Sequence, residues 1–273
     1  MLKTIYNKLN YLEYQMGIGK FSSLLKLNKQ LKNAAVSEKR CFILATGPSI
    51  KSMDLSPLES EFCISVSNFF VHPLFSKIKP RYHVFAGTHP PLTNEHIGNW
   101  WKDATASLTG NIQTRVLLNA NDKKIKDQFE VFSNQQVFYY WGNGKFPVEF
   151  TKQIPAIQTV VHIALYLAMY LGIKEIYLLG CDHSWINHYR ESMHFYHESQ
   201  HSFTRNNYSE WSEIKDMGEE FKSYANLWDI YRNIRTEAIS LNVGIYNATP
   251  GSLLDIFPRK EFAAIHNPAT ING

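Results

Sequence analysis

Short apolar segments alternate with longer mixed segments along most of this chain. Seven of the short segments have the length and the branched or aromatic residues of buried strands, and turn-forming or polar residues follow them. We predict strands at residues 41–45, 62–67, 82–86, 116–119, 136–140, 175–180 and 243–246. The segments between them predict helices at 57–62, 156–171 and 221–240.

The most apolar segment, residues 156–171, resembles a membrane span by composition alone. It has 16 residues, contains His162, and lies between Pro155 and Gly172. Because a bilayer span needs about 20 apolar residues, we predict a helix buried in a protein core instead.

Strands that alternate with helices indicate an α/β protein with a Rossmann-like, mostly parallel sheet and helices on both faces. The 273 residues are enough for one such domain with an appendage. We assign residues 1–39 to a basic amphipathic helical arm and 40–273 to a single domain with a His- and Tyr-rich lid at about residues 183–217. In parallel sheets ligands bind outside the carboxyl ends of the strands, so the polar residues there are the candidate site.

The basic charge is concentrated in the first 40 residues. They carry eight Lys and Arg and two acidic residues, a net charge of +6, whereas the whole chain is +4, which leaves −2 for the remainder. Apolar residues recur there at helical spacing, at Leu2, Ile5, Tyr6, Leu9, Leu12 and Met16. A basic amphipathic helix can lie on an anionic membrane surface, so residues 1–36 are a candidate peripheral membrane contact. Packing on the chain's own domain or on a second subunit of a homo-oligomer is the alternative.

Composition excludes several other classes. The chain is 44% hydrophobic and 14% aromatic, which is typical of a folded globular protein. No long apolar segment follows Met1, and three isolated cysteines at 41, 63 and 181 fit buried thiols in a reducing cytoplasm. Outside the arm no basic stripe is interleaved with aromatic residues, so nucleic acid is not an expected partner. We therefore expect a cytoplasmic protein, at the inner face of the membrane if the arm binds lipid.

The first predicted strand ends in Thr46, Gly47, Pro48 and Ser49. Gly47 permits unusual backbone angles and lets a ligand approach the main chain, Pro48 suits a first helical position, and Ser49 offers a hydroxyl. Backbone N–H groups at such a turn are well placed to hold a phosphate, although an ordinary strand-to-helix turn looks the same. The glycine-rich dinucleotide motif and the P-loop motif are both missing from the sequence, which disfavours nicotinamide-type Rossmann proteins and P-loop NTPases.

Other predicted strands also end in polar residues. These are Asn68, Thr88, His89, Asp182, His183, Asn247, Thr249 and Ser252, and we expect them to converge over one pocket. Asp182 is placed to bind a ribose hydroxyl, a metal ion or a histidine that it orients. No Asp-x-Asp occurs, which disfavours the nucleotide-sugar transferases that hold a cation on a diphosphate.

Histidines are concentrated in one segment. Five of the eleven lie between residues 183 and 201, at His183, His188, His194, His197 and His201, among Tyr189, Arg190, Tyr196 and Arg205. A long segment with weak periodicity is typical of a lid or binding loop. Three alternatives stay open: a catalytic or substrate lid with a histidine base, a zinc site of His194, His197 and Asp182, or a surface lid with incidental histidines. We expect no metal site, because no Cys or Glu pair completes a tetrahedral set.

Five short motifs of this chain occur together in a known group of proteins. They are Ala-Thr-Gly-Pro-Ser-Ile at 45–50, Ser-Asn-Phe-Phe at 67–70, Thr159, Gly-Ile-Lys-Glu-Ile-Tyr-Leu-Leu-Gly-Cys-Asp at 172–182 and Pro-Gly-Ser-Leu-Leu at 250–254. With them the chain resembles the bacterial family-42 sialyltransferases over about residues 40–258. It equally resembles the wider MptE-like group, which includes archaeal 6-hydroxymethylpterin diphosphokinases.

The resemblance to the sialyltransferases implies a metal-independent, inverting transfer of a sialic-acid-like (nonulosonic) sugar from a CMP donor to a cell-surface glycan, as in lipopolysaccharide or capsule synthesis. It implies a nucleotide-sugar-binding domain that requires no cofactor. It implies donor contacts at Gly47, Pro48, Ser49, Asn68, Thr159, Asp182, Pro250, Gly251 and Ser252, and the strand exits add Thr46, Thr88 and His183 as candidates.

The sequence also departs from the sialyltransferase pattern. Those enzymes carry asparagine where Thr46 stands and a second asparagine near Gly87. Ser184 replaces the first of their two lid tyrosines, and Tyr189 or Tyr196 approximates the second. Their catalytic histidine closely precedes the last long helix. We predict His194 as the base, with His201 as the second candidate, and Tyr189 as a catalytic residue that neutralises the departing phosphate.

Two other functions stay open at this stage. An MptE-like diphosphokinase that transfers pyrophosphate from ATP to a pterin-like alcohol would need Mg²⁺ and a cluster of carboxylates, of which the strand ends offer mainly Asp182. A non-catalytic nucleotide-binding protein is the third candidate.

Overall fold

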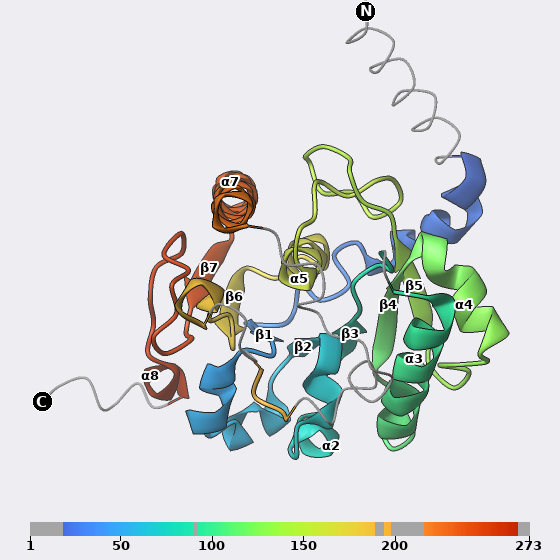
Figure 1. Ribbon diagram of the computed structural model, residues 1–273, viewed down its shortest axis with the longest axis horizontal. Helices are drawn as coiled ribbons and strands as arrows, with labels where there is room; N and C mark the ends of the chain where they lie inside the picture. Colours follow the sequence, from blue (N-terminus) through green and yellow to red (C-terminus); the bar gives the residue numbers. More distant parts are fainter. Residues whose placement is uncertain (1–18, 90–91, 189–193, 198–215, 267–273) are drawn as a thin grey trace, which may run out of the picture.

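The structure, a computed structural model, describes residues 19–89, 92–188, 194–197 and 216–266. Its centre is a seven-stranded sheet in the order β5-β4-β3-β2-β1-β6-β7, and every pairing in it is parallel (Figure 1). The strands are β1 (Cys41–Leu44), β2 (Cys63–Val66), β3 (Tyr82–Val84), β4 (Arg115–Asn119), β5 (Val137–Tyr140), β6 (Glu175–Leu179) and β7 (Gly244–Asn247). All seven predicted strands are present, and their ends differ from the predicted ones by two residues at most.

The order of the strands fixes where a ligand is expected. From β1 the chain adds β2, β3, β4 and β5 on one side, and then returns to place β6 and β7 on the other side of β1. The direction of winding therefore reverses between β1 and β6. In open parallel sheets this topological switch point leaves a crevice at the carboxyl ends of the two strands, and ligands bind there.

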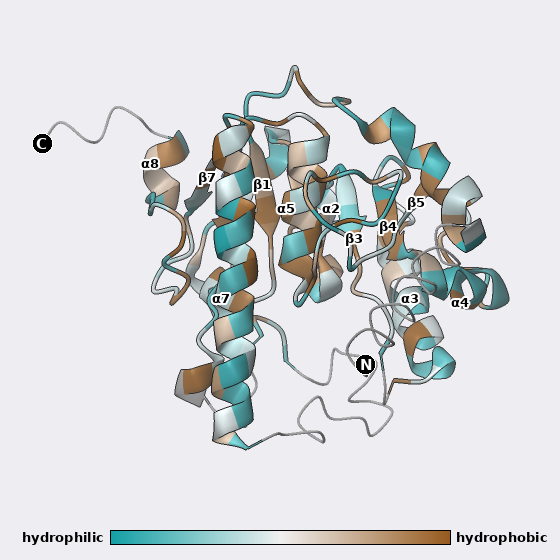
Figure 2. Ribbon diagram, turned by 90° about the horizontal axis from the view of Figure 1, so that it is seen from above, coloured by the Kyte–Doolittle hydropathy of each residue, from teal (hydrophilic) through white to brown (hydrophobic). Residues whose placement is uncertain are grey.

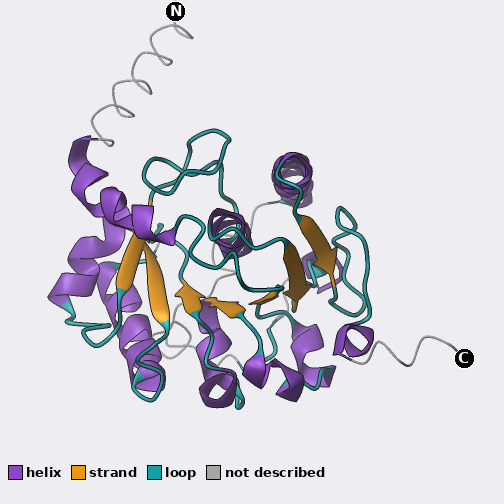
Figure 3. Ribbon diagram, turned by 180° about the vertical axis from the view of Figure 1, so that it is seen from behind, coloured by secondary structure: helices purple, strands orange, loops and turns teal. Residues whose placement is uncertain are grey.

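Helices cover both faces of the sheet, as the sequence predicts for this fold class (Figure 3). One face carries α5 (Val160–Tyr170) and α7 (Met217–Ser240). The other carries α2 (Phe75–Ile78), α3 (Asn94–Leu108), α4 (Lys123–Gln128) and α8 (Phe262–His266). Short 3-10 helices complete the described fold: η1 (Leu27–Leu31), η2 (Pro48–Ser52), η3 (Ser56–Ser60), η4 (Ser67–Val71), η5 (Ala120–Asp122) and η6 (Trp185–His188).

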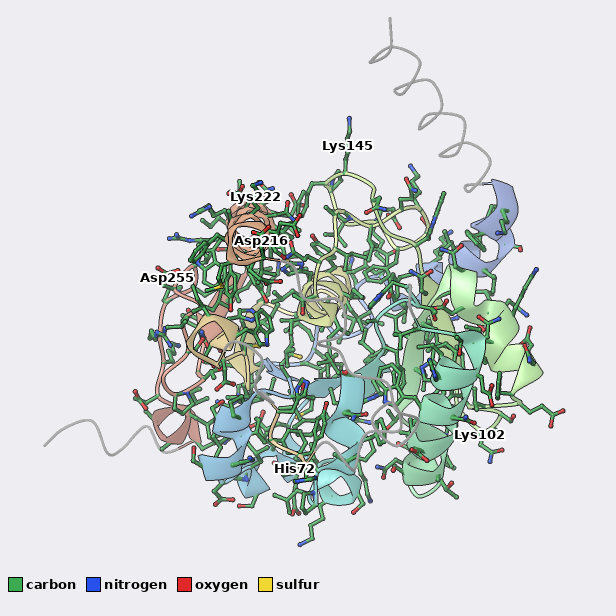
Figure 4. All side chains as sticks on the ribbon, in the orientation of Figure 1. His72, Lys102, Lys145, Asp216, Lys222 and Asp255 are labelled. Carbon is green, nitrogen blue, oxygen red and sulfur yellow. The ribbon has the colours of Figure 1, made fainter. Side chains whose placement is uncertain are left out.

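Alternate residues of each strand supply the two cores. In β1, Cys41 and Ile43 pack under α5 and α7, whereas Phe42 and Leu44 pack with the helices of the opposite face. The labelled side chains of Asp216 and Lys222 on α7 mark the first face in Figure 4, and those of His72 and Lys102 mark the second. Both faces of the sheet are buried, which explains why its strands are continuously apolar.

The helices differ more from the predictions than the strands do. α7 begins at Met217 and not at 221, because the Asp216 carboxylate accepts hydrogen bonds from the N–H groups of Gly218 and Glu219. Its outer surface is largely hydrophilic (Figure 2). The predicted helix at 57–62 is the 3-10 helix η3. The predicted helix at 156–171 is α5, which starts only at Val160, because its N-cap Thr159 has an extended backbone. α3 was not predicted, although a Thr93–His96 capping box starts it.

The described part of the predicted arm packs on the domain. Phe21 and Leu25 are buried in the core of the second face, and the Asn28 amide donates to the carbonyl oxygens of Tyr139 (2.6 Å) and Phe150 (2.7 Å). Residues 1–18, which hold all six residues of the predicted amphipathic pattern, lie outside the described residues. Of the described helices, none combines the length and the apolar character needed to cross a membrane.

Because three histidines are buried, we predict that the free energy of unfolding falls steeply in mild acid. Burial lowers the pKa of His83 and His162 from the usual 6.5 to about 3, and that of His183 to about 4. The unfolded chain binds these protons below pH 6.5 and the folded chain does not, so stability is full above pH 6.5 and falls as the pH drops toward 4. We expect a slope of about 4 kcal/mol per pH unit near pH 5 from the three groups together.

Urea unfolding at pH 7, 6 and 5 measures this slope. The His83→Gln variant should lose about a third of it, because it removes one of three similar groups. His83 is a suitable choice, since its ring donates to the Ser67 carbonyl (2.9 Å) and contacts the Ser65 hydroxyl (2.7 Å) well inside the core. A flat stability between pH 7 and 5 would contradict the assignment of these rings as neutral.

Candidate functional site

A cavity of about 70 Å³ lies at the topological switch point. The turn after β1, the start of α5 and the segment after β6 enclose it. Its lining includes seven of the predicted site residues: Thr46, Gly47, Pro48, Thr159, Asp182, His183 and His194. The cavity is large enough for a phosphate-sized group.

The turn after β1 is fixed by the exit of β6. The Gly47 N–H donates to the Gly180 carbonyl at 2.9 Å. The Ser49 N–H donates to Asp182 Oδ1 at 3.0 Å, and the Ser49 hydroxyl donates to Asp182 Oδ2 at 2.8 Å. Pro48 is the first residue of η2, as predicted. The two strands at the switch point are therefore tied together through one carboxylate.

These contacts correct the predicted use of the turn as a phosphate cradle. The N–H groups of Gly47 and Ser49 already have acceptors, Pro48 has none to donate, and the Ile50 N–H donates to the Gly47 carbonyl. Backbone amides of residues 47–50 are thus not free to hold an anion. Within this turn, a ligand would therefore have to be held by side chains.

The reason for a glycine at position 47 also differs from the predicted one. Its φ of −64° is accessible to any residue. Space is what demands glycine, because a Cβ there would lie 1.9 Å from Asp182 Oδ2 and 2.5 Å from the Gly180 carbonyl oxygen. The groups that approach Gly47 closely are therefore Asp182 and Gly180 of the same chain, and not a ligand as predicted.

Asp182 is a structural anchor in this arrangement. The pKa of its carboxyl is raised overall, because burial raises it more than the two hydrogen bonds from Ser49 lower it. Both carboxylate oxygens are engaged by Ser49, so the group offers little to a ribose or to a cation. Among the described residues, no group of three or more His, Cys, Asp or Glu side chains is arranged to hold a metal ion.

The exit of β7 lies against the exit of β6. The Ser252 hydroxyl donates to the Cys181 carbonyl at 2.6 Å and accepts from the Asn247 amide at 3.0 Å. The Arg259 guanidinium, which sequence reasoning missed, donates to the carbonyl oxygens of Thr249 and Ser252. The Ser252 side chain is buried and fully used inside the protein, while Pro250 and Gly251 are exposed beside it.

Val66 at the end of β2 lines the cavity, but the predicted site residues after β2 and β3, Asn68 and Thr88, do not, which corrects the expected convergence of five exits. Asn68 is fully buried, and its Oδ1 accepts a hydrogen bond from Trp100 Nε1 at 2.5 Å. The N–H of Thr88 donates to Asp122 at 2.9 Å, beyond β4.

A short described piece of the predicted lid crosses the site. The N–H of Phe195 donates to the Thr46 carbonyl at 3.0 Å, and His194 Nδ1 lies 3.4 Å from the Thr46 hydroxyl. The His194 ring stacks on the Tyr196 ring, with 4.8 Å between the centroids. The predicted catalytic residues Tyr189 and His201 lie outside the described residues.

His183 also lines the cavity and has a partner that sequence reasoning missed. Its Nε2 is 2.7 Å from the hydroxyl of Tyr231 on α7. Tyr231 is fully buried, and the His162 ring stands edge-on to it with 4.4 Å between the centroids. Its position on the buried side of α7, one turn from Leu227 and Ile234, was the available signal, because a buried tyrosine hydroxyl needs a partner.

Comparison with known proteins gives similarity at the level of structure. No family model and no curated protein matches the sequence. The sialyltransferase CST-II in complex with trisaccharide acceptor and CMP is 16% identical over 81% of this chain and 85% of that chain, with a TM-score of 0.48. CstII from Campylobacter jejuni in complex with CMP-3FNeuAc is 17% identical over 81% and 85%, with a TM-score of 0.43. Because both TM-scores are below 0.5, the function proposed below rests on the geometry and motifs of this chain.

Proposed function

We propose that this protein is a glycosyltransferase that moves a sialic-acid-like sugar from a CMP donor to a glycan hydroxyl, with inversion and without a metal ion. The observation that carries the proposal is the grouping of Thr46, His183 and His194 around a phosphate-sized cavity at the switch point. Hydroxyl and imidazole groups are hydrogen-bonding partners that suit a monophosphate. The motifs at 45–50, 172–182 and 250–254 support CMP as the nucleotide.

The proposed reaction is a single displacement. The acceptor hydroxyl oxygen attacks the anomeric carbon, the bond from that carbon to the phosphate oxygen breaks, and CMP leaves with the bonding electron pair. A base takes the proton of the attacking hydroxyl, and hydrogen bonds to the phosphate stabilise the charge that develops on it. We assign the base to His194, which reaches the cavity wall beside Thr46, and the phosphate contacts to Thr46 and His183.

We also propose a location for this enzyme. Of the candidate membrane contact at residues 1–36, the described residues from 19 onward pack on the domain, so residues 1–18 are the part proposed to lie on an anionic membrane surface. This position suits an acceptor glycan that is assembled at the inner face of the membrane. Loss of vesicle binding on removal of residues 1–18, with the packed residues from 19 onward retained, would support it.

Thermal unfolding with nucleotides tests the proposed donor. A ligand at 100 times its Kd stabilises the folded state by about 2.7 kcal/mol, or a rise of about 5–10 °C in Tm. We expect this rise with CMP or CDP, unchanged by EDTA, and smaller effects with UDP, GDP and ATP. Thr46→Val should reduce the rise with CMP, whereas Thr236→Val, which alters an exposed hydroxyl on α7 bonded to its own helix, should not.

The same screen separates the competing functions. Stabilisation by ATP that depends on Mg²⁺ would replace the proposal with a diphosphokinase. No stabilisation by any of the five nucleotides would remove the CMP-dependent transferase altogether.

A further inference from the structure

The ring of His183 is held from one side. Its Nε2 is hydrogen-bonded to the Tyr231 hydroxyl at 2.7 Å, and the rings of Trp185 and Trp228 flank it at centroid distances of 4.9 and 5.9 Å. His183 also has a left-handed backbone, with a φ of 51°. Its other ring nitrogen, Nδ1, has no hydrogen-bond partner in the described part of the chain. The buried atoms that lack a partner do not include Nδ1, so this nitrogen is not sealed inside the core. Nδ1 is therefore the ring nitrogen that remains for the cavity that His183 lines.

The position of the proton on His183 follows from the needs of Tyr231. Tyr231 is 0% exposed, and within the described residues the acceptor near its hydroxyl is His183 Nε2. If Nε2 carried the proton, it would donate to the tyrosine oxygen and leave the phenolic O–H buried without an acceptor. A buried O–H donor without an acceptor costs more free energy than a lone pair of the phenol oxygen that accepts no hydrogen bond. The favoured arrangement has the phenol donating to Nε2, which places the ring proton on Nδ1.

We propose that Tyr231 fixes the neutral Nδ1–H tautomer of His183, and that this N–H donates a hydrogen bond to a phosphate oxygen of the nucleotide in the cavity. The inference rests on the proposed function for the identity of the nucleotide. It assigns His183 as a phosphate-binding residue and Tyr231 as a positioning residue that acts through it. Because the neutral ring already carries its proton on the cavity side, His183 cannot serve as the base.

The surroundings of the ring agree with a neutral state. Burial lowers the pKa of His183 to about 4. The titratable groups that face it are the Tyr231 phenol, His162, and two residues that line the same cavity, Asp182, whose oxygens are both engaged by Ser49, and His194. His162 accepts the Gln158 N–H at its Nδ1 (3.2 Å), so that ring is neutral as well.

Two substitutions at position 183 separate the roles of the two ring nitrogens. Asparagine places an amide N–H near the position of Nδ1 and tolerates a left-handed backbone. Glutamine reaches the position of Nε2, keeps a partner for Tyr231, and has no donor at the Nδ1 position. By calorimetric titration with CMP we expect His183→Asn to stay within about threefold of the wild-type Kd. We expect His183→Gln to raise the Kd about tenfold or more, the effect of one lost hydrogen bond to a charged group.

Histidine-labelled protein, studied by ¹⁵N NMR without ligand, tests the tautomer directly. The wild-type signals of His183, assigned by their loss in His183→Asn, should show a protonated Nδ1 and an unprotonated Nε2. Tyr231→Phe should shift the ring toward the Nε2–H form and weaken CMP binding severalfold.

Each of these experiments has an outcome that would overturn one part of the proposal. An Nε2–H tautomer in the wild type would overturn the role of Tyr231. Equal CMP affinity of the wild type and His183→Gln would overturn the phosphate contact. Failure of the wild type to bind CMP would count against the proposed function, while the NMR result would still decide the tautomer. If Tyr231→Phe does not fold, the wild-type spectrum and the pair of His183 variants remain decisive.

Discussion

Replacing Gly47 with alanine is expected to lower the free energy of unfolding by about 3–5 kcal/mol. The new Cβ would lie 1.9 Å from Asp182 Oδ2 and 2.5 Å from the Gly180 carbonyl oxygen. The Asp182 side chain can rotate away, but the Gly180 oxygen belongs to the backbone at the end of β6. Overpacking of this kind costs about 1–3 kcal/mol, and displacing Asp182 from Ser49 adds the loss of hydrogen bonds to a charged group, about 1.5–3 kcal/mol.

Urea unfolding at pH 7 measures this loss against Gly110→Ala. Gly110 has no atom within 4 Å of its ideal Cβ position and no positive φ, so the control should change stability by less than about 1 kcal/mol. Stability of Gly47→Ala equal to that of this control would show that the turn does not pack against β6 as described.

The sheet was predictable because each strand is a continuous apolar segment with a clear end. Both of its faces are buried, so the length of each apolar segment and the turn residues that follow it identify the strands without any information about their partners. Helix α3 was not predicted, although its buried residues Ile97, Trp100, Trp101, Ala104 and Leu108 recur at helical spacing, and within it only Gly98 is a poor helix former. The Gly98 Cβ position lies 2.4 Å from Phe129, a contact that only the folded chain reveals.

The site was predictable in its location and less so in its chemistry. Polar residues after strands pointed to the end of the sheet where the cavity lies, and Gly47, Asp182 and His194 all line that cavity. Which groups stay free for a ligand depends on pairings between distant segments. Ser49 and Asp182 are 133 residues apart in the sequence, and their mutual hydrogen bonds use up the amide and the carboxylate that looked available. The Tyr231 contact with His183 is equally non-local.

Replacing His194 with glutamine is expected to lower kcat for sugar transfer by about 10²–10⁴, the usual contribution of a general base. Glutamine can keep a hydrogen bond toward Thr46, whose hydroxyl lies 3.4 Å from His194 Nδ1, but it cannot accept a proton. The nucleotide should therefore still bind, and the loss should fall on kcat. Release of CMP from a CMP-sialic acid donor, in the presence of a panel of glycan acceptors, measures both constants.

The matched control is His96→Gln at the start of α3, because glutamine at that position still completes the capping box with Thr93. That variant should keep the wild-type kcat. His201→Gln is the competing test, since His201 is the second candidate base in the sequence. Full activity in His194→Gln together with a loss in His201→Gln would transfer the role to His201. Full activity in both variants would mean that neither imidazole takes the proton, because glutamine at either position cannot replace a general base.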